Sequence, residues 1–551
     1  MPDDRRRRLT LLGLVVVSVL ALAVSFGYDS VRDKSESTVS ASHDDTTTTT
    51  TAKAKTDKGR KADKGKGSTS SATGFTTDYT GFADPNGFLK PYPNASVSGL
   101  LTFRGNPSRS YYGMGPVPTA PQVLHRFPPD GPMCKSSTNL GTTKVWCGMG
   151  WTGQPTIVER KDRTWAIFAG YDGHIHFMDA VTGQRILPDV PTGDIIKGTP
   201  TIDPDGYPLV YTGSRDDQLR IIATDRDGKA EVLWMQDSEE FPPNLWNDDW
   251  DSSPIILGDY MVEGSESSRF WVFKLNRSYD ANGKVQVKPQ VLFTTPVWDQ
   301  QALDDNGDEQ ASVESSVAIY KDTAYFGTSA GLIWGYDLSP VRSGGKPKEV
   351  FRFWTSGDND PSVVVDDEGY LYVAGENDRP GARSDEVGQL TKLDPRNTAH
   401  PIVWKYNQTT VKGQGIYGTP GIFGDTIIVG GDDGKLTGLD RKTGAVKWTK
   451  QMKGPVWGSP VVVDKVLLIG DCLSGFLHAY DMKNPDVDPP QLWQVALPGC
   501  IEATPAVWKG RIYLGTRGGY LYVLGNKDLA TSPTTVPTGG TATNDTSYQS
   551  D

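Results

Sequence analysis

Short apolar runs recur along most of the chain, and turns rich in glycine, proline and polar residues separate them. Eight of these runs open a repeating unit, often with Ser/Thr-Pro, and their starts lie 40 to 63 residues apart: 154–158, 199–203, 253–257, 316–320, 362–366, 419–423, 459–463 and 504–508. Apolar runs of about five residues between turn signals predict buried β-strands. Their regular return predicts a repeat architecture.

Three further runs follow the first in a typical unit. The second run ends in glycine every time, at Gly170, Gly213, Gly264, Gly327, Gly375, Gly430, Gly470 and Gly515. The third ends at aspartate in six units, at Asp179, Asp225, Asp337, Asp394, Asp440 and Asp481. The fourth carries an aromatic residue: Trp234, Phe293, Phe351, Trp404, Trp448 and Trp493. The pattern predicts an all-β fold, an eight-bladed β-propeller of four-stranded blades over residues 95–527. We expect the aspartate to cap a turn and the aromatic to pack between blades.

The eighth unit lacks a fourth strand, because nothing resembling one follows residue 524. A segment ahead of the first unit, Pro121–His125, resembles the fourth strand at Pro289–Phe293. We therefore expect an N-terminal strand to complete the eighth blade and close the ring, since an unpaired edge is a liability.

The N-terminus carries the longest apolar run, Leu9–Phe26, directly after four arginines at 5–8. Eighteen uncharged residues suffice to cross a bilayer, and basic residues before a span favour the cytoplasmic side. The pattern predicts a cytoplasmic N-terminus at 1–8, a transmembrane signal-anchor at 9–28 and an extracytoplasmic propeller at the cell membrane. A cleaved signal peptide is the alternative, since Ala21-Leu-Ala23 could serve as a cleavage site.

Low-complexity segments flank the repeats on both sides. Residues 29–94 include six consecutive threonines and a lysine-rich piece, and residues 528–551 are rich in Ser and Thr. Such compositions bury too little apolar surface to fold, so we expect a disordered stalk and a disordered tail.

Charge and cysteine content narrow the classes of partner and compartment. The net charge is -11, which argues against nucleic acid as a partner. Four cysteines fit an oxidising compartment. Blade order places Cys472 and Cys500 on the same face of neighbouring blades, which predicts the disulfides Cys472–Cys500 and Cys134–Cys147.

One position, three residues before the Pro of each first strand, lies near the channel mouth of the predicted propeller. Its occupants form the candidate ligand site: Thr152, Lys197, Asp251, Glu314, Asp360, Tyr417, Trp457 and Glu502. Crowded carboxylates raise each other's pKa or recruit a cation, so Asp251, Glu314 and Asp360 are candidate metal ligands. The alternative is a solvated acidic funnel in which Lys197 is an internal partner.

The Ser/Thr-Pro openings, together with the Ala/Gly-x-Asp…Thr-Gly-x-x-x-Trp pattern, resemble the PQQ-like repeat over about residues 100–525. That repeat is shared by quinoprotein alcohol dehydrogenases and by the propeller lipoprotein of outer-membrane assembly. Trp250-Asp251 resembles the Trp-Asp-x-Asp motif of the dehydrogenases, which implies a PQQ and Ca²⁺ pocket with Asp251 catalytic. Ser253 replaces the second aspartate and no adjacent cysteine pair occurs, and both departures weigh against that implication.

The sequence thus favours a membrane-anchored, extracytoplasmic propeller that binds or scaffolds a protein or a cell-envelope polymer without a cofactor. The alternative function is a PQQ-dependent alcohol or sugar dehydrogenase whose site lies in the acidic funnel.

Overall fold

The computed structural model describes residues 74–139, 141–150, 153–160 and 162–529. The predicted membrane span at 9–28, most of the predicted stalk and the tail beyond residue 529 lie outside these residues, as does Thr152. Across the described ranges, no helix is both long and apolar enough to cross a membrane.

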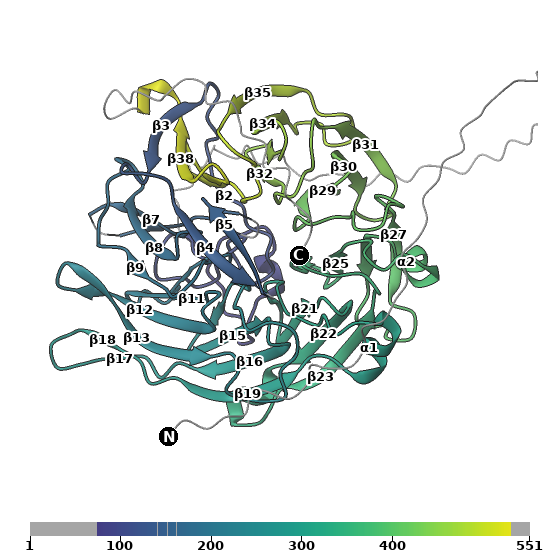
Figure 1. Cartoon of the computed structure of the whole chain (residues 1–551), viewed down its shortest axis with the longest axis horizontal. Coiled ribbons are helices and arrows are strands. Elements are labelled where there is room, and N and C mark those ends of the chain that lie inside the picture. The colour runs from purple at the N-terminus through teal and green to yellow at the C-terminus, as the bar shows by residue number, and fades with distance from the viewer. Residues whose placement is uncertain (1–73, 140, 151–152, 161, 530–551) are drawn as a thin grey trace, which may run out of the picture. The chain divides into compact units, whose positions relative to one another are not determined.

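Eight sheets of four or five strands stand side by side around a common axis, so the described chain is an eight-bladed β-propeller (Figure 1). Blade 1 has the strand order β1 (Gly99–Leu100), β6 (Thr156–Glu159), β7 (Thr164–Ala169), β8 (His174–Asp179) and β9 (Val190–Pro191). Blade 2 contains β10 (Thr201–Ile202), β11 (Leu209–Thr212), β12 (Gln218–Arg226) and β13 (Lys229–Asp237). Blade 3 contains β14 (Ile255–Leu257), β15 (Tyr260–Ser265), β16 (Arg269–Lys274) and β19 (Gln290–Pro296). Blade 4 contains β20 (Ala318–Tyr320), β21 (Thr323–Gly327), β22 (Leu332–Asp337) and β23 (Lys348–Trp354).

The second half of the ring repeats this order. Blade 5 contains β24 (Val364–Val365), β25 (Leu371–Ala374), β26 (Leu390–Leu393) and β27 (Ile402–Tyr406). Blade 6 contains β28 (Gly421–Phe423), β29 (Thr426–Gly430), β30 (Lys435–Asp440) and β31 (Val446–Gln451). Blade 7 contains β32 (Val461–Val463), β33 (Val466–Gly470), β34 (Phe476–Asp481) and β35 (Gln491–Ala496). Blade 8 has the order β2 (Gly113–Met114), β36 (Ala506–Trp508), β37 (Arg511–Thr516), β38 (Tyr520–Gly525) and β3 (Gln122–Phe127).

The remaining described elements lie outside the blade sheets. Two hairpins pair β4 (Cys134–Asn139) with β5 (Thr142–Cys147) and β17 (Ser278–Tyr279) with β18 (Val285–Gln286). The short helices are η1 (Pro85–Gly87), α1 (Gln300–Asn306), η2 (Ser339–Ser343), α2 (Ala382–Val387) and η3 (Lys527–Leu529).

Blades 1 and 8 have five strands where the sequence predicted four. The N-terminal segment adds the extra strands, because β1 pairs with β6 and β2 runs parallel to β36. The segment that resembles a fourth strand, β3, pairs antiparallel with β38 at the outer edge of blade 8.

The repeat signature has two structural roles. The Asp440 carboxylate accepts the backbone N–H of Lys442 and Thr443, so it caps the turn between third and fourth strands. The Trp404 indole donates to the Arg441 carbonyl of the next blade at 3.1 Å. Trp448 likewise donates to Pro485 in blade 7. Each tryptophan therefore joins its blade to the following one.

The Ser/Thr residues that open the first strands form a chain of hydrogen bonds around the axis. Each hydroxyl accepts the backbone N–H of the equivalent residue one blade earlier, at 2.9 to 3.1 Å, along the series Gln154, Thr199, Ser253, Ser316, Ser362, Thr419 and Ser459. These N–H groups are buried, so the hydroxyls satisfy donors that would otherwise be costly.

A buried segment before blade 1, residues 99–112, lies among the inner strands. Its two arginines are fully buried and donate to carbonyls at the openings of first strands: Arg104 to Pro420 and Pro460, and Arg109 to Ser253 and Val317. One guanidinium has five N–H donors. Each arginine therefore joins two blades that are neighbours in the ring, blades 6 and 7 for Arg104 and blades 3 and 4 for Arg109.

Residues 74–94 fall within the predicted disordered stalk, but the structure places them on the propeller. The Ala83 N–H donates to the Lys321 carbonyl at 2.8 Å, and Phe82 packs edge-on against Tyr260. Tyr92 is buried and its hydroxyl donates to the Ile256 carbonyl. Aromatic residues in this segment supply the apolar surface that the Thr/Lys-rich segment before it lacks.

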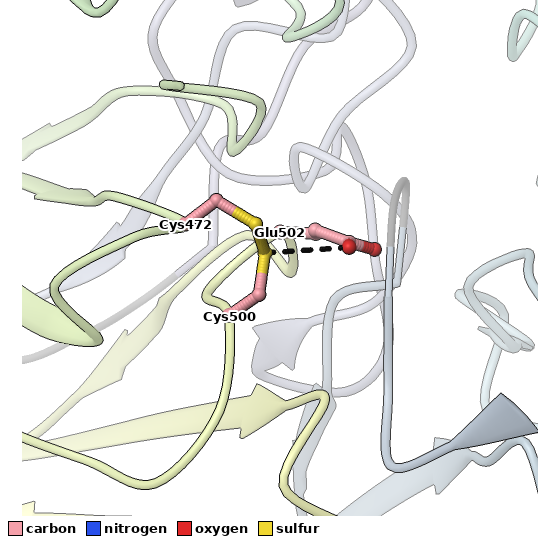
Figure 2. Close-up of side chains that lie close together, drawn as sticks. All are labelled: Cys472, Cys500 and Glu502. Atoms are coloured by element: carbon pink, nitrogen blue, oxygen red, sulfur yellow. Dashed lines mark hydrogen bonds between the residues drawn. A yellow bond between two sulfur atoms is a disulfide. The ribbon is translucent and has the colours of Figure 1, made fainter. Parts of the chain in front are cut away.

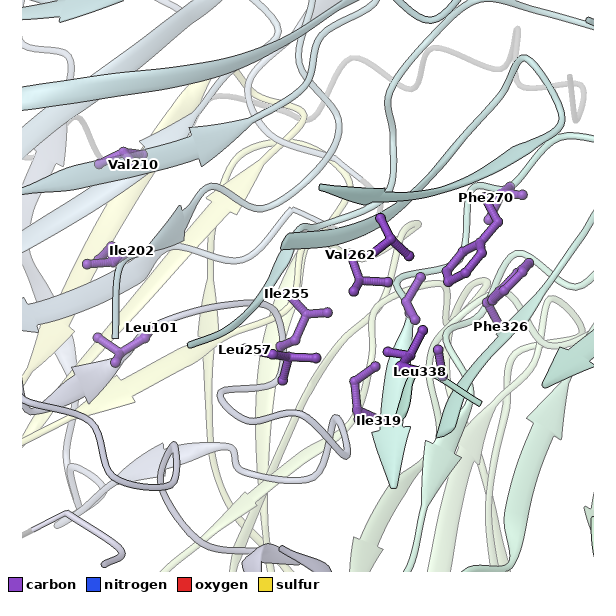
Figure 3. Close-up of a cluster of buried hydrophobic side chains, with 14 of the residues drawn as sticks. Leu101, Ile202, Val210, Ile255, Leu257, Val262, Phe270, Ile319, Phe326 and Leu338 are labelled. Carbon is purple, nitrogen blue, oxygen red and sulfur yellow. The ribbon is translucent and has the colours of Figure 1, made fainter. Parts of the chain in front are cut away.

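The cores lie between neighbouring blades. In Figure 3 side chains from blades 2, 3 and 4 form one cluster with Leu101 from the N-terminal segment. Phe270 of β16 stacks on Phe326 of β21 with ring centroids 4.8 Å apart. Because this packing joins adjacent sheets, it holds the loops at the ends of the blades in fixed positions.

Candidate functional site

The candidate site lies at one end of the propeller axis. Within an antiparallel blade, the loop into the first strand and the loop between the second and third strands emerge at the same end. These two kinds of loop carry the group that we call the funnel: Lys197, Arg215, Asp249, Asp251, Glu266, Glu314, Asp358, Asp360, Glu376, Tyr417, Trp457, Glu502 and Arg517.

Three carboxylates of blade 3, Asp249, Asp251 and Glu266, form the blade 3 triad, and all three are buried. The Lys197 ammonium lies 2.5 Å from Asp251 Oδ2 and 3.5 Å from Glu266 Oε1. Arg215 Nε lies 2.5 Å from Asp249 Oδ2. Blade 2 thus supplies two cations to three acids of blade 3.

Burial and mutual repulsion shift the titration of this triad. Burial, together with the Asp251 carboxylate, raises the pKa of Glu266 to about 8. Burial and Glu266 raise the pKa of Asp249 to about 7. Burial lowers the pKa of Lys197, but Asp251 and Glu266 outweigh it and hold that pKa well above its usual value, so the ammonium stays charged.

A second group of carboxylates, Asp358, Asp360 and Glu376, forms the blade 5 triad. One ligand oxygen from each lies within 4.8 Å of the others. Burial, followed by the Asp358 carboxylate, raises the pKa of Asp360 and that of Glu376 well above the usual range. Burial and Glu266 raise the pKa of the neighbouring Glu314 to about 8. Acid groups therefore dominate this half of the funnel.

Two aromatic side chains adjoin the blade 5 triad. The Tyr417 and Trp457 rings meet nearly edge-on with centroids 6.1 Å apart, and both are half-buried. The Tyr417 hydroxyl lies beside the Glu376 carboxylate. The Trp457 indole donates to Asp432 at 2.6 Å. The funnel therefore combines carboxylates with partly exposed aromatic surface.

The disulfide Cys472–Cys500 joins blades 7 and 8 at the funnel, as the sequence predicts. Figure 2 shows Glu502 beside it, with Oε1 3.3 Å from Cys500 Sγ. A disulfide sulfur carries no proton, so this is a contact rather than a hydrogen bond, and the pair offers no thiolate to a metal. Glu502 also pairs with Arg517 at 3.3 Å.

The second disulfide, Cys134–Cys147, is also as predicted. The two cysteines face each other in the register of the β4–β5 hairpin. Trp146 of this hairpin lies beneath the guanidinium groups of Arg215, 5.4 Å away, and Arg517, 4.9 Å away. The hairpin is thereby fixed to the funnel through cation–π contacts.

The structure separates the residues that the sequence grouped as one site. Asp251 belongs to the blade 3 triad and Asp360 to the blade 5 triad. Glu314 belongs to neither triad, and its charge acts on both Asp251 and Asp360. Trp250 lies in the core against Trp271, and its indole donates to the Asp217 carbonyl.

This arrangement does not fit the PQQ pocket that the resemblance implied. A fully buried Trp250 presents no free ring face to a cofactor, and Lys197 already neutralises Asp251. We therefore derive no reaction step for PQQ.

Sequence reasoning missed about half of the funnel. Arg215, Glu266, Glu376 and Arg517 come one or two residues after the glycine that ends each second strand. Their shared position after that glycine is a repeat signal of the same kind as the position before the Pro, and it identifies them from sequence. Arg104 and Arg109 carry no such repeat signal.

Known proteins share the repeat and the fold. The family model described as outer membrane protein assembly factor BamB matches residues 386–524. These residues cover blades 6 and 7 and parts of blades 5 and 8, within a ring of eight blades. The chain is a PQQ-like repeat propeller.

Three solved structures illustrate what this PQQ-like repeat propeller is similar to. BamB from Moraxella catarrhalis is 18% identical, with a TM-score of 0.46, over 67% of this chain and 94% of that one. The computationally designed protein Ika8 is 12% identical, with a TM-score of 0.48, over 68% and 98%. Sqt1 of Saccharomyces cerevisiae is 10% identical, with a TM-score of 0.49, over 68% and 95%. None of the curated proteins matches the sequence.

Proposed function

We propose that this PQQ-like repeat propeller is a membrane-anchored, extracytoplasmic binding module that holds a partner protein on its funnel face. The observation that carries the proposal is the concentration of acid groups beside the Tyr417–Trp457 pair at one end of the axis. Aromatic residues next to charged groups are typical of recognition surfaces. The family whose model matches residues 386–524 is described as an assembly factor, which is consistent with a scaffold role.

The proposed location is supported by the sequence and by the disulfides. The apolar run Leu9–Phe26 would hold the chain in the cell membrane, with residues 1–8 in the cytoplasm. Two disulfides, both near the funnel, are stable in an oxidising compartment. A cell-envelope polymer could meet the same face, but the half-buried aromatic pair favours a protein.

The test is quantitative affinity capture of the full-length chain from detergent-solubilised membranes. The variant Tyr417→Ala/Trp457→Ala removes the aromatic surface, and Val487→Ser alters an exposed residue on the loop between β34 and β35, at the opposite end. We expect the first variant to lose its co-purifying protein at least tenfold and the second to retain it. Equal recovery from both, with unchanged thermal melting, would contradict the proposal.

A further inference from the structure

The two acidic triads of the funnel occupy equivalent places in the repeat. In each, two aspartates separated by one residue precede the first strand, and a glutamate follows the second strand. The same backbone hydrogen bond joins them: the N–H of Glu266 donates to the Asp249 carbonyl at 2.9 Å, and that of Glu376 donates to the Asp358 carbonyl at 2.9 Å. The blade 3 triad therefore shows what such a triad can bind.

The blade 3 triad binds a primary ammonium. Lys197 Nζ lies between Asp251 and Glu266, at 2.5 and 3.5 Å. Lys197 and Arg215 both come from the preceding blade, one before its first strand and the other after its second. The chain thus places a lysine side chain of its own among three carboxylates.

The blade 5 triad lacks both of these cations. At the positions of Lys197 and Arg215, the preceding blade 4 carries Glu314 and Ser329. Within the described part of the chain, no Lys, Arg or His forms an ion pair with the blade 5 triad, and the nearby Arg379 pairs with Asp378 at 2.9 Å. Where blade 2 presents the Lys197 ammonium to the blade 3 triad, blade 4 therefore presents the Glu314 carboxylate to the blade 5 triad.

Two oxygen atoms of the blade 5 triad are buried without a partner. Asp358 is 5% exposed and Asp360 is 6% exposed, and Oδ1 of each accepts no hydrogen bond from any described residue. Burying an unpaired carboxylate is costly unless a proton or a cation compensates it. Burial and the Asp358 carboxylate hold the pKa of Asp360 well above its usual range, so a proton compensates this group in the free protein, and an external cation would take the place of that proton.

We propose that the blade 5 triad, with Glu314, binds the side chain of a lysine from a partner protein. The ammonium would lie among the carboxylates as Lys197 does in blade 3. The Tyr417 ring beside Glu376, with Trp457 next to it, offers apolar surface to the methylene stem. This inference rests on the proposed function, because it names the chemistry of the partner at the funnel face.

Isothermal titration of the purified full-length protein in detergent tests the inference. The probes are the peptide acetyl-Gly-Lys-Gly-amide, its arginine counterpart, cadaverine and CaCl₂. We expect saturable binding of the lysine peptide, weaker binding of the arginine peptide, and a loss of at least tenfold in Asp360→Asn/Glu376→Gln. The matched variant Asp367→Asn/Glu368→Gln, in the exposed turn between β24 and β25 at the end of blade 5 opposite the funnel, should bind as the unaltered protein does.

Each other outcome overturns the inference. Binding of CaCl₂ alone would make the triad a metal site, and binding of cadaverine without the lysine peptide would exclude a protein source. Binding of no probe would leave the triad without a ligand role. If the double variant melts earlier, Glu376→Gln alone, at the more accessible position, serves in its place. If no probe binds the triad but a partner protein is still captured in a manner that depends on Tyr417 and Trp457, the triad has no role in binding. The proposed function would then still stand.

Discussion

Single hydroxyl groups join the blades of the propeller at the residue scale. The series from Thr199 to Ser459 explains why Ser or Thr precedes the first strands, since each hydroxyl accepts an N–H from the blade before. The sequence displayed these residues clearly, but a periodic Ser/Thr-Pro reads equally well as turn chemistry. Only the closing of the ring brings each hydroxyl to its neighbour's backbone.

Removing one hydroxyl of this series should destabilise the fold. Ser316→Ala leaves the buried Ser253 N–H without its acceptor, which costs about 1–3 kcal/mol. Urea unfolding monitored by tryptophan fluorescence gives the change in the free energy of unfolding. Thr398→Ala, in an exposed loop, is the control, and equal values for the two variants would show that the hydroxyl series contributes little.

The buried Glu266 should make stability depend on pH. Its pKa rises from the usual 4.5 to about 8 in the folded chain, so the folded state holds a proton that the unfolded state has released. Its contribution to stability is therefore present below about pH 4.5 and falls as pH rises towards 8. We expect Glu266→Gln to unfold at higher urea concentration than the unaltered protein at pH 8, and the difference to shrink towards pH 5. A difference that stays constant with pH would contradict the pKa shift.

At the scale of elements, the periodicity predicted the eight blades and both disulfides. Four-stranded units follow from apolar runs and turn residues, which are local signals. The inner strands β1 and β2 were not predicted, because a two-residue strand has no periodicity to detect. The packing of residues 74–94 was missed as well, since average composition hides a few well-placed aromatic residues.

The disulfide between blades 7 and 8 should stabilise the ring. Cys472 and Cys500 are 28 residues apart in sequence, and closing a loop of that size is worth roughly 3–4 kcal/mol on the chain-entropy model. Cys472→Ser/Cys500→Ser should lower the free energy of unfolding by that order. Cys134→Ser/Cys147→Ser, in the hairpin outside the blades, should cost less. The reverse order would contradict a role of the first disulfide in holding the ring.

We also expect β3 to close the ring. Deleting residues 121–127 would expose the outer edge of β38, its partner in blade 8, and repeat folds lose cooperativity when a terminal unit is uncapped. The deletion variant should unfold in a broad transition at lower temperature. Unchanged calorimetric melting would show that the eighth blade does not need this strand.

At the scale of the whole molecule, the two halves of the funnel differ in charge balance. Blade 2 supplies Lys197 and Arg215 to the blade 3 triad, whereas the acids of blades 4 and 5 meet no such pair among the described residues. The sequence predicted the convergence of charges but treated the funnel as one acidic site. The division into a paired and an unpaired half depends on which loop side chains meet across blades, and no local pattern encodes that.

The most direct test of the central claim, that a partner binds the funnel face, is site-specific photo-cross-linking of the full-length chain in intact cells. A photoreactive residue replaces Val411, on the loop into blade 6 at the funnel face, or Val487, on a loop at the opposite end; these side chains are 54% and 50% exposed. The binding-module account predicts one discrete cross-linked protein from position 411 and none from position 487. Discrete products from position 487 alone, or from neither position, would contradict it.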